Sequence, residues 1–196
     1  NAYDTHASLG ASNDLGYIQL SGSQLKQDFL GLPHGTNNPI AGQDGKMINS
    51  SANDKRGIVK VGFTPRVNDE YTFTYINQDG EQDNTPYAGT SSQKSRYWQW
   101  PEYDKESYYY QGTTHLGDSL TLKSRLYHDT FKNTLLMYNS LADLHNKNGS
   151  YSHYSDYSTG AGLQLAADVR QNDQLSFAVN WKDDVHREKS AVNGPY

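Results

Sequence analysis

Cysteine is absent from this chain of 196 residues, and so is any long apolar run. The first absence excludes disulfides and thiolate metal sites. The second excludes a membrane-spanning helix, which needs a run of about 18 apolar residues or more. Only 34% of the residues are hydrophobic, which is little for a protein with a large buried core. A composition this polar is typical of disordered chains.

The aromatic residues argue against disorder. The chain has 16 Tyr, 5 Phe and 3 Trp, and disordered segments are poor in these residues. A transmembrane β-barrel reconciles the polar composition with a folded chain, because only every second residue of a strand faces lipid. The formal net charge of -5 gives no support for a nucleic-acid partner.

Apolar and polar residues alternate along several segments, and this alternation is typical of strands with one apolar face. Phe177 and Val179 fall on one face of such a segment and Lys182 on the other. In a second segment, Leu122 and Lys123 likewise fall on opposite faces. Eight strands are predicted, near residues 1–9, 15–24, 56–64, 70–77, 106–116, 119–129, 158–168 and 173–184.

The charged positions on these strands favour a water-filled lumen over a dry core. Burial of Lys123 or Arg125 without a partner is costly, whereas exposure to water is not. The residues predicted to face the lumen are Lys123, Arg125, Gln164 and Lys182. The residues predicted to face lipid are Leu120, Leu122, Leu163, Leu165, Phe177 and Val179.

Short and long connections alternate between the predicted strands. The short links are 10–15, 64–69, 117–118 and 168–173, and the long external loops are 24–55, 78–105 and 130–157. Outer-membrane barrels have short periplasmic turns and long external loops. The sequence therefore predicts an all-β fold, an antiparallel transmembrane β-barrel, in the bacterial outer membrane.

Part of the sequence resembles the barrel of TonB-dependent outer-membrane receptors. The resemblance covers roughly residues 50–190. It rests on Gln78-Asp79-Gly80-Glu81, Pro86-Tyr87-Ala88-Gly89, Arg96-Tyr97-Trp98-Gln99-Trp100-Pro101-Glu102-Tyr103, Arg125-Leu126-Tyr127-His128-Asp129 and Asp184-Val185-His186-Arg187-Glu188.

The resemblance implies import of a scarce ligand, most often a ferric siderophore or a similar small metal chelate. It also implies a partnership with TonB through a plug domain. Neither a plug nor a TonB-box segment is found in this chain. The expectation is therefore a roughly eight-strand part of a larger 22-stranded barrel in outer-membrane lipid.

An aromatic and cationic group in the second long loop is the candidate ligand surface. Flat rings and a guanidinium group can stack on an anionic or catecholate chelate. An interfacial aromatic girdle with loop packing is the alternative. The candidate residues are Tyr87, Arg96, Tyr97, Trp98, Trp100 and Tyr103.

No catalytic residue, cofactor or metal ligand is predicted. Asp184 and His186 share a strand face, but no nucleophile stands out beside them, so the chain is not expected to be an enzyme. Asn77, Asp79, Glu81 and Asp83 place oxygen ligands at every second residue, but these are too few for calcium.

Two other protein classes remain open at the level of sequence. A free-standing eight-stranded barrel, acting as an adhesin or anchor, would pair its inward charges, for example Lys123 or Arg125 with Asp168. A soluble glycan-binding β-sandwich would instead bury one face of each strand in a shared dry core.

Overall fold

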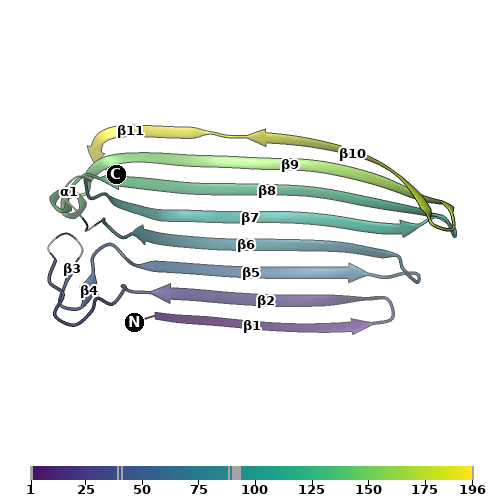
Figure 1. Ribbon diagram of the computed structural model, residues 1–196, viewed down its shortest axis with the longest axis horizontal. Helices are drawn as coiled ribbons and strands as arrows, with labels where there is room; N and C mark the ends of the chain where they lie inside the picture. Colours follow the sequence, from purple (N-terminus) through teal and green to yellow (C-terminus); the bar gives the residue numbers. More distant parts are fainter. Residues whose placement is uncertain (1, 39, 41, 88, 90–93, 196) are drawn as a thin grey trace.

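The computed structural model is one broad antiparallel sheet (Figure 1). It describes residues 2–38, 40, 42–87, 89 and 94–195. The first residue of the predicted strand 1–9 lies outside these described residues. So do parts of the predicted loops 24–55 and 78–105, namely residues 39, 41, 88 and 90–93.

The sheet follows the order of the chain, with each long strand antiparallel to its neighbour. The long strands are β1 (Ala2–Asn13), β2 (Gly16–Gln27), β5 (Ala52–Phe63), β6 (Glu70–Asn84), β7 (Tyr97–His115), β8 (Leu120–Tyr138), β9 (Asn148–Arg170) and β10 (Asp173–Val185). The last strand, β11 (Glu188–Pro195), continues along the edge of β9 that β10 also occupies. The antiparallel all-β fold predicted from the sequence is confirmed.

Strands β6 to β9 extend well beyond the predicted limits. Residues 78–84 and 97–105 lie in β6 and β7, and residues 130–138 and 148–157 lie in β8 and β9. The predicted boundaries of these loops are therefore wrong. Backbone pairing continues past the apolar alternation, through segments with polar residues on both faces, and there the sequence carries no period-2 signal.

Tight turns join the strands at one end of the sheet, and the longer connections gather at the other end, with both termini (Figure 1). The long connections carry the short strands β3 (Gly42–Gln43) and β4 (Lys46–Met47) and the helix α1 (Leu141–Asn146). Gly117, between β7 and β8, has a φ of 78°, which glycine adopts without strain.

Apolar side chains line one face of the sheet across all eight long strands. Leu165 lies opposite Leu122 on one side and Phe177 on the other, and Leu163 lies opposite Val179. We call this surface the apolar belt. Its exposed members are Leu9, Ile18, Leu20, Val59, Val61, Phe63, Phe73, Tyr108, Leu126, Leu163, Leu165, Leu175, Phe177, Val179 and Trp181.

No strand among the described residues covers the apolar belt. Its side chains remain open, with Phe177 at 72% exposure and Val179 at 53%. Monomeric soluble proteins rarely leave so wide an apolar surface in water. The β-sandwich alternative requires a second sheet against this face, and the described residues place none there.

A small buried cluster holds the loop end together. Tyr97, Leu136, Tyr138 and Leu144 form it, and partly buried side chains from α1, β9 and the 28–51 connection pack around them. Ser140 caps α1, since its Oγ accepts a hydrogen bond from the backbone N–H of Asp143 at 3.0 Å. The cluster fixes α1 and the connection on the sheet.

Candidate functional site

The face opposite the apolar belt carries polar and charged side chains, and we call it the polar face. Lys123 lies opposite Gln164, Arg125 opposite Gly162, and Lys182 opposite Gly160. All four residues predicted to face a lumen therefore share this face. The six predicted to face lipid, Leu120, Leu122, Leu163, Leu165, Phe177 and Val179, all lie on the other face with the belt.

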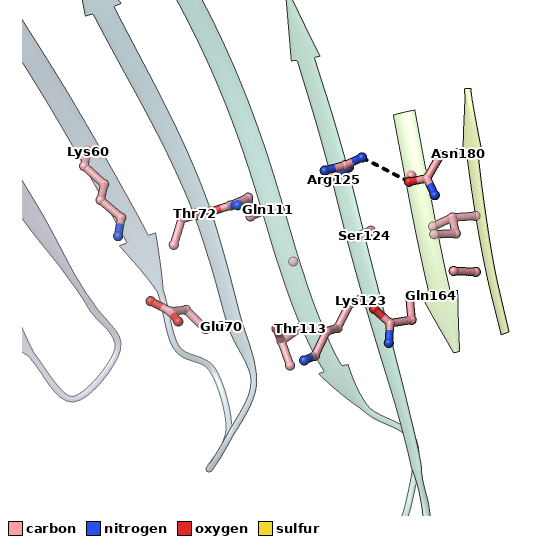
Figure 2. A pocket seen from close by; sticks show the side chains of 14 residues that line it. Lys60, Glu70, Thr72, Gln111, Thr113, Lys123, Ser124, Arg125, Gln164 and Asn180 are labelled. Carbon is pink, nitrogen blue, oxygen red and sulfur yellow. Dashed lines mark hydrogen bonds between the residues drawn. The ribbon is translucent and has the colours of Figure 1, made fainter. Parts of the chain in front are cut away.

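A groove of about 470 Å³ runs across the polar face between β5 and β10 (Figure 2). Lys60, Lys123 and Arg125 bring three cationic groups to it, against one carboxylate, Glu70. Glu70 accepts a hydrogen bond from the Tyr17 hydroxyl at 2.6 Å. Within the described residues, no ion pair neutralises the three cations.

Nearer the loop end, the charges on the polar face are paired. Lys182 lies 2.6 Å from Asp184, and Nδ1 of His186 lies 2.9 Å from Asp156. Asp129 accepts hydrogen bonds from the hydroxyls of Ser107 and Tyr109, both at 2.6 Å. Asp184 and His186 therefore have separate partners and are not joined to each other.

Most of the candidate aromatic residues lie at the loop end of the polar face. Trp98 and Trp100 meet edge to face at 6.1 Å between ring centroids, and the Arg96 guanidinium lies 5.3 Å from the Trp98 ring centre. Tyr103 packs edge to face on Phe131 at 4.9 Å. The structure thus brings together Arg96, Trp98 and Trp100, with Tyr103 on the same face.

A β-bulge in β7 decides which face these rings occupy. Between Gln99 and Glu102 the register shifts, so that Trp100 and Pro101 lie against a single residue of β8. Trp98 pairs with Met137, which alternation along β8 places on the face of Lys123. The two tryptophans therefore stay on the polar face with Tyr103.

Tyr97 corrects the predicted ligand surface. It pairs with Tyr138 on the belt side of the sheet, beyond the belt, and is only 4% exposed. Its hydroxyl donates to the carbonyl oxygen of Ile40 at 3.4 Å, and burial raises the pKa of the Tyr97 phenol. Tyr97 therefore contributes to the buried cluster and offers no surface to a ligand.

Tyr87 lies apart from the tryptophans, in the connection between β6 and β7. It lines a second cavity with Arg96, Lys94, Asn84 and Thr85. Tyr87 is 46% exposed, and its carbonyl oxygen accepts a hydrogen bond from the Ser95 hydroxyl at 2.6 Å. Arg96 belongs to both groups, since it lines this cavity and lies over Trp98.

Of the comparisons with known proteins, the one with solved structures bears on the fold, and none of them shows a family. No family model matches the chain, and no curated protein matches it. Among solved structures, the chain is similar to the copper transporter OprC. The TM-score is 0.70 at 18% sequence identity, and the match covers 96% of this chain and 27% of that chain. The chain thus spans about a quarter of that protein's length.

The likeness to OprC shows the fold alone, a broad antiparallel sheet that matches part of an outer-membrane barrel. This fold fits the predicted location in the bacterial outer membrane. In the described part of the chain, no helix has the length and apolar character of a membrane span.

The sequence did not single out Lys60, Lys94 or Phe131 as parts of a site. Lys60 and Arg125 are 65 positions apart in the chain and meet one groove only through the order of the strands. Phe131 on β8 contacts Tyr103 on the neighbouring strand β7. Alternation alone could have placed Lys60 and Phe131 on the polar face, but only the register shows which residues are neighbours.

Proposed function

We propose that the chain forms part of the wall of an outer-membrane receptor barrel that imports a scarce ligand. The observation that carries the proposal is the opposition of the two faces of one sheet: an open apolar belt on one side and a grooved, charged face on the other. The belt would contact outer-membrane lipid, and the polar face would line the lumen. The likeness in fold to a transporter barrel supports this assignment.

The open edges support a barrel larger than these strands alone. The sheet order ends at β1 on one side and at β10 on the other, and the two are not paired. Long unpaired edges invite association, and barrels remove them by closure. We propose that further strands of the native protein cover both edges, as in the 22-stranded barrels of the family that the sequence resembles.

A free-standing eight-stranded barrel fits the contacts less well. That alternative pairs Lys123 or Arg125 with Asp168. Instead, Arg125 donates to Asn180 at 3.1 Å, and Asp168 accepts from Gln174 at 2.9 Å. An adhesin or anchor role is therefore not proposed.

The ligand proposed is an anionic metal chelate, most simply a ferric siderophore. Arg96, Trp98 and Trp100 offer a cation and flat rings at the loop end, where an external ligand arrives first. Energy would come from TonB through a plug domain, as in the receptors that the sequence resembles. Bare copper ions favour Cys, Met and His ligands, and in the described residues no three His, Cys, Asp or Glu side chains converge.

Uptake by living cells tests the import function. A strain lacking the gene and a strain complemented with the full-length gene would be supplied with radioactive iron as a ferric catecholate, hydroxamate or citrate, or with radioactive copper(II). We expect the complemented strain to accumulate the ferric catecholate faster, and a proton ionophore to abolish the difference. Equal accumulation of all four probes in both strains would overturn the proposed import.

A further inference from the structure

We propose that Arg125, Lys123 and Gln164 form an anion-binding subsite in the groove of the polar face, near the tight turns. The ligand class is a small molecule with carboxylate groups. This inference rests on the proposed function, because it places a second contact for an anionic chelate on its route. The subsite is separate from the aromatic group at the loop end.

A glycine on the neighbouring strand leaves room for the side chain of Arg125. Arg125 lies opposite Gly162, and its Nη2 donates to Oδ1 of Asn180 on the strand beyond (Figure 2). A Cβ atom at Gly162 would come within 2.9 Å of Arg125 Nε and 2.7 Å of Asn180 Oδ1. The missing side chain therefore leaves the space across which the guanidinium group extends.

The same arrangement, in which a large side chain lies over a glycine of the neighbouring strand, recurs on the polar face with neutral side chains. Tyr127 lies across Gly160, and Tyr17 lies across Gly62, each over the glycine directly opposite. Large side chains laid over strand glycines restore packing that glycine lacks. At Gly162 the covering side chain is charged, so packing alone does not explain the choice of arginine.

Among the described residues, the charge around Arg125 is not balanced. Lys123 lies on the same face two residues away, and Lys60 lines the far side of the groove. Glu70 is the one carboxylate among the residues that line it. Elsewhere on this face, lysines have acidic partners, as with Lys182 and Asp184. An excess of cations in a concave site favours an anion.

The donor set suits carboxylate groups in particular. A guanidinium group can donate two parallel hydrogen bonds to one carboxylate, and an ammonium group beside it can bind a second. One hydrogen bond of Arg125 goes to the neutral Asn180 amide, and no carboxylate of the described residues forms an ion pair with Arg125. The Gln164 amide lies next to Lys123 in Figure 2 and adds a neutral donor.

The subsite lies farther along the sheet than the aromatic group, on the side of the tight turns. Arg125 and Phe131 lie six residues apart on β8, which corresponds to about 20 Å along a strand. A chelate released from the aromatic group would therefore meet the cationic groove next on its way toward the tight turns. We expect this second contact to favour anionic chelates over neutral ones.

Equilibrium dialysis of the purified full-length protein with radioactive citrate tests the subsite. Citrate is the probe because it carries three carboxylates. We expect wild-type protein to bind citrate, and Arg125→Gln and Lys123→Gln each to weaken binding roughly tenfold or more, since each removes a charge-assisted contact. Gly162→Ala should weaken binding comparably, although it removes no charge, because the new methyl group displaces the guanidinium group.

Lys132→Gln is the matched control. Lys132 is an exposed lysine on the same strand, but alternation places it on the opposite face. Its substitution should leave citrate binding unchanged. Outer-membrane level and the shift in gel mobility on heating would show that each variant folds.

Three results would overturn the inference: no citrate binding by folded wild-type protein, unchanged binding by Arg125→Gln, or an equal loss in Lys132→Gln. Failure here is distinguishable from failure of the proposed function. A protein that imports a neutral ferric hydroxamate but binds no citrate keeps the import function and loses this subsite.

Discussion

At the scale of single residues, the two faces of the sheet predict opposite responses to charge. Leu122 and Lys123 are neighbours on β8, and they point to the belt and to the polar face. Leu122→Arg should lower the free energy of unfolding by about 2–4 kcal/mol if the belt lies in lipid near the midplane. Lys123→Ala should change it little, because Lys123 has no ion-pair partner among the described residues.

Urea unfolding of the native protein in lipid vesicles measures both substitutions. Val179→Arg on β10 provides a second belt position, since its side chain is 53% exposed. Equal effects of the belt and polar-face substitutions would contradict the assignment of lipid to the apolar belt.

The tryptophans at the loop end give a second prediction at this scale. Trp98→Ala combined with Trp100→Ala should weaken capture of an anionic ferric catecholate by cells tenfold or more, because the edge-to-face pair and the Arg96 contact are both lost. Cell-surface binding at low temperature, before uptake, is the measurement.

Trp181→Ala is the control for this pair. Trp181 is a tryptophan of the apolar belt and is 58% exposed. Its loss should leave capture intact at equal protein level. Capture that is unchanged in the double variant would remove the tryptophans from the ligand surface.

The sequence predicted which face of the sheet a residue occupies wherever no bulge interrupts the strand. Leu165 and Phe177, or Lys123 and Gln164, share a face because every second residue of a strand does, and the register then aligns neighbouring strands. Tyr97 was the failure. Counting by twos puts Tyr97 and Tyr103 on one face, but the bulge at Trp100 and Pro101 inserts one residue between them and separates them.

At the scale of elements, the helix α1 depends on one buried side chain. Leu144 is the buried residue of α1, and it packs in the cluster with Tyr97, Leu136 and Tyr138. A helix of six residues has little stability of its own. Leu144→Ala should therefore release α1 from the sheet, since such truncations cost about 2–5 kcal/mol in packed cores.

Hydrogen exchange of the native protein in detergent would show the release. Amides of residues 141–147 should exchange at least tenfold faster in Leu144→Ala, with the amides of β7 and β8 near the tight turns unchanged. Asn146→Ala, an exposed position on the same helix, should leave exchange as it is. Equally protected amides in all three proteins would show that Leu144 does not anchor α1.

The order of the strands was predictable from the sequence, and their lengths were not. Tight-turn residues such as Gly117 mark one end of each hairpin clearly. At the other end, β8 and β9 continue beyond the belt with polar side chains on both faces, as at Asn133 and Ser155. Backbone hydrogen bonds to the neighbouring strand hold these extensions, and such pairing leaves no mark in either sequence alone.

At the scale of the whole molecule, the two ends of the sheet differ in a way that predicts its orientation in an outer membrane. The tight turns gather at one end, and α1 with the long connections at the other (Figure 1). Outer-membrane barrels keep short turns in the periplasm. The turn at Asp14 should therefore face the periplasm, and Asn146 on α1 should face the outside of the cell.

The absence of cysteine from this chain allows a direct test of that orientation. Asn146→Cys and Asp14→Cys both place a thiol at an exposed position, at opposite ends of the sheet. In intact cells, a maleimide that cannot cross the outer membrane should label Asn146→Cys and leave Asp14→Cys unlabelled. After the outer membrane is permeabilised, both should react, which shows that both thiols are accessible. Labelling of Asp14→Cys alone in intact cells would reverse the orientation and would move the tryptophans of β7 to the periplasmic side, where an external ligand does not arrive first.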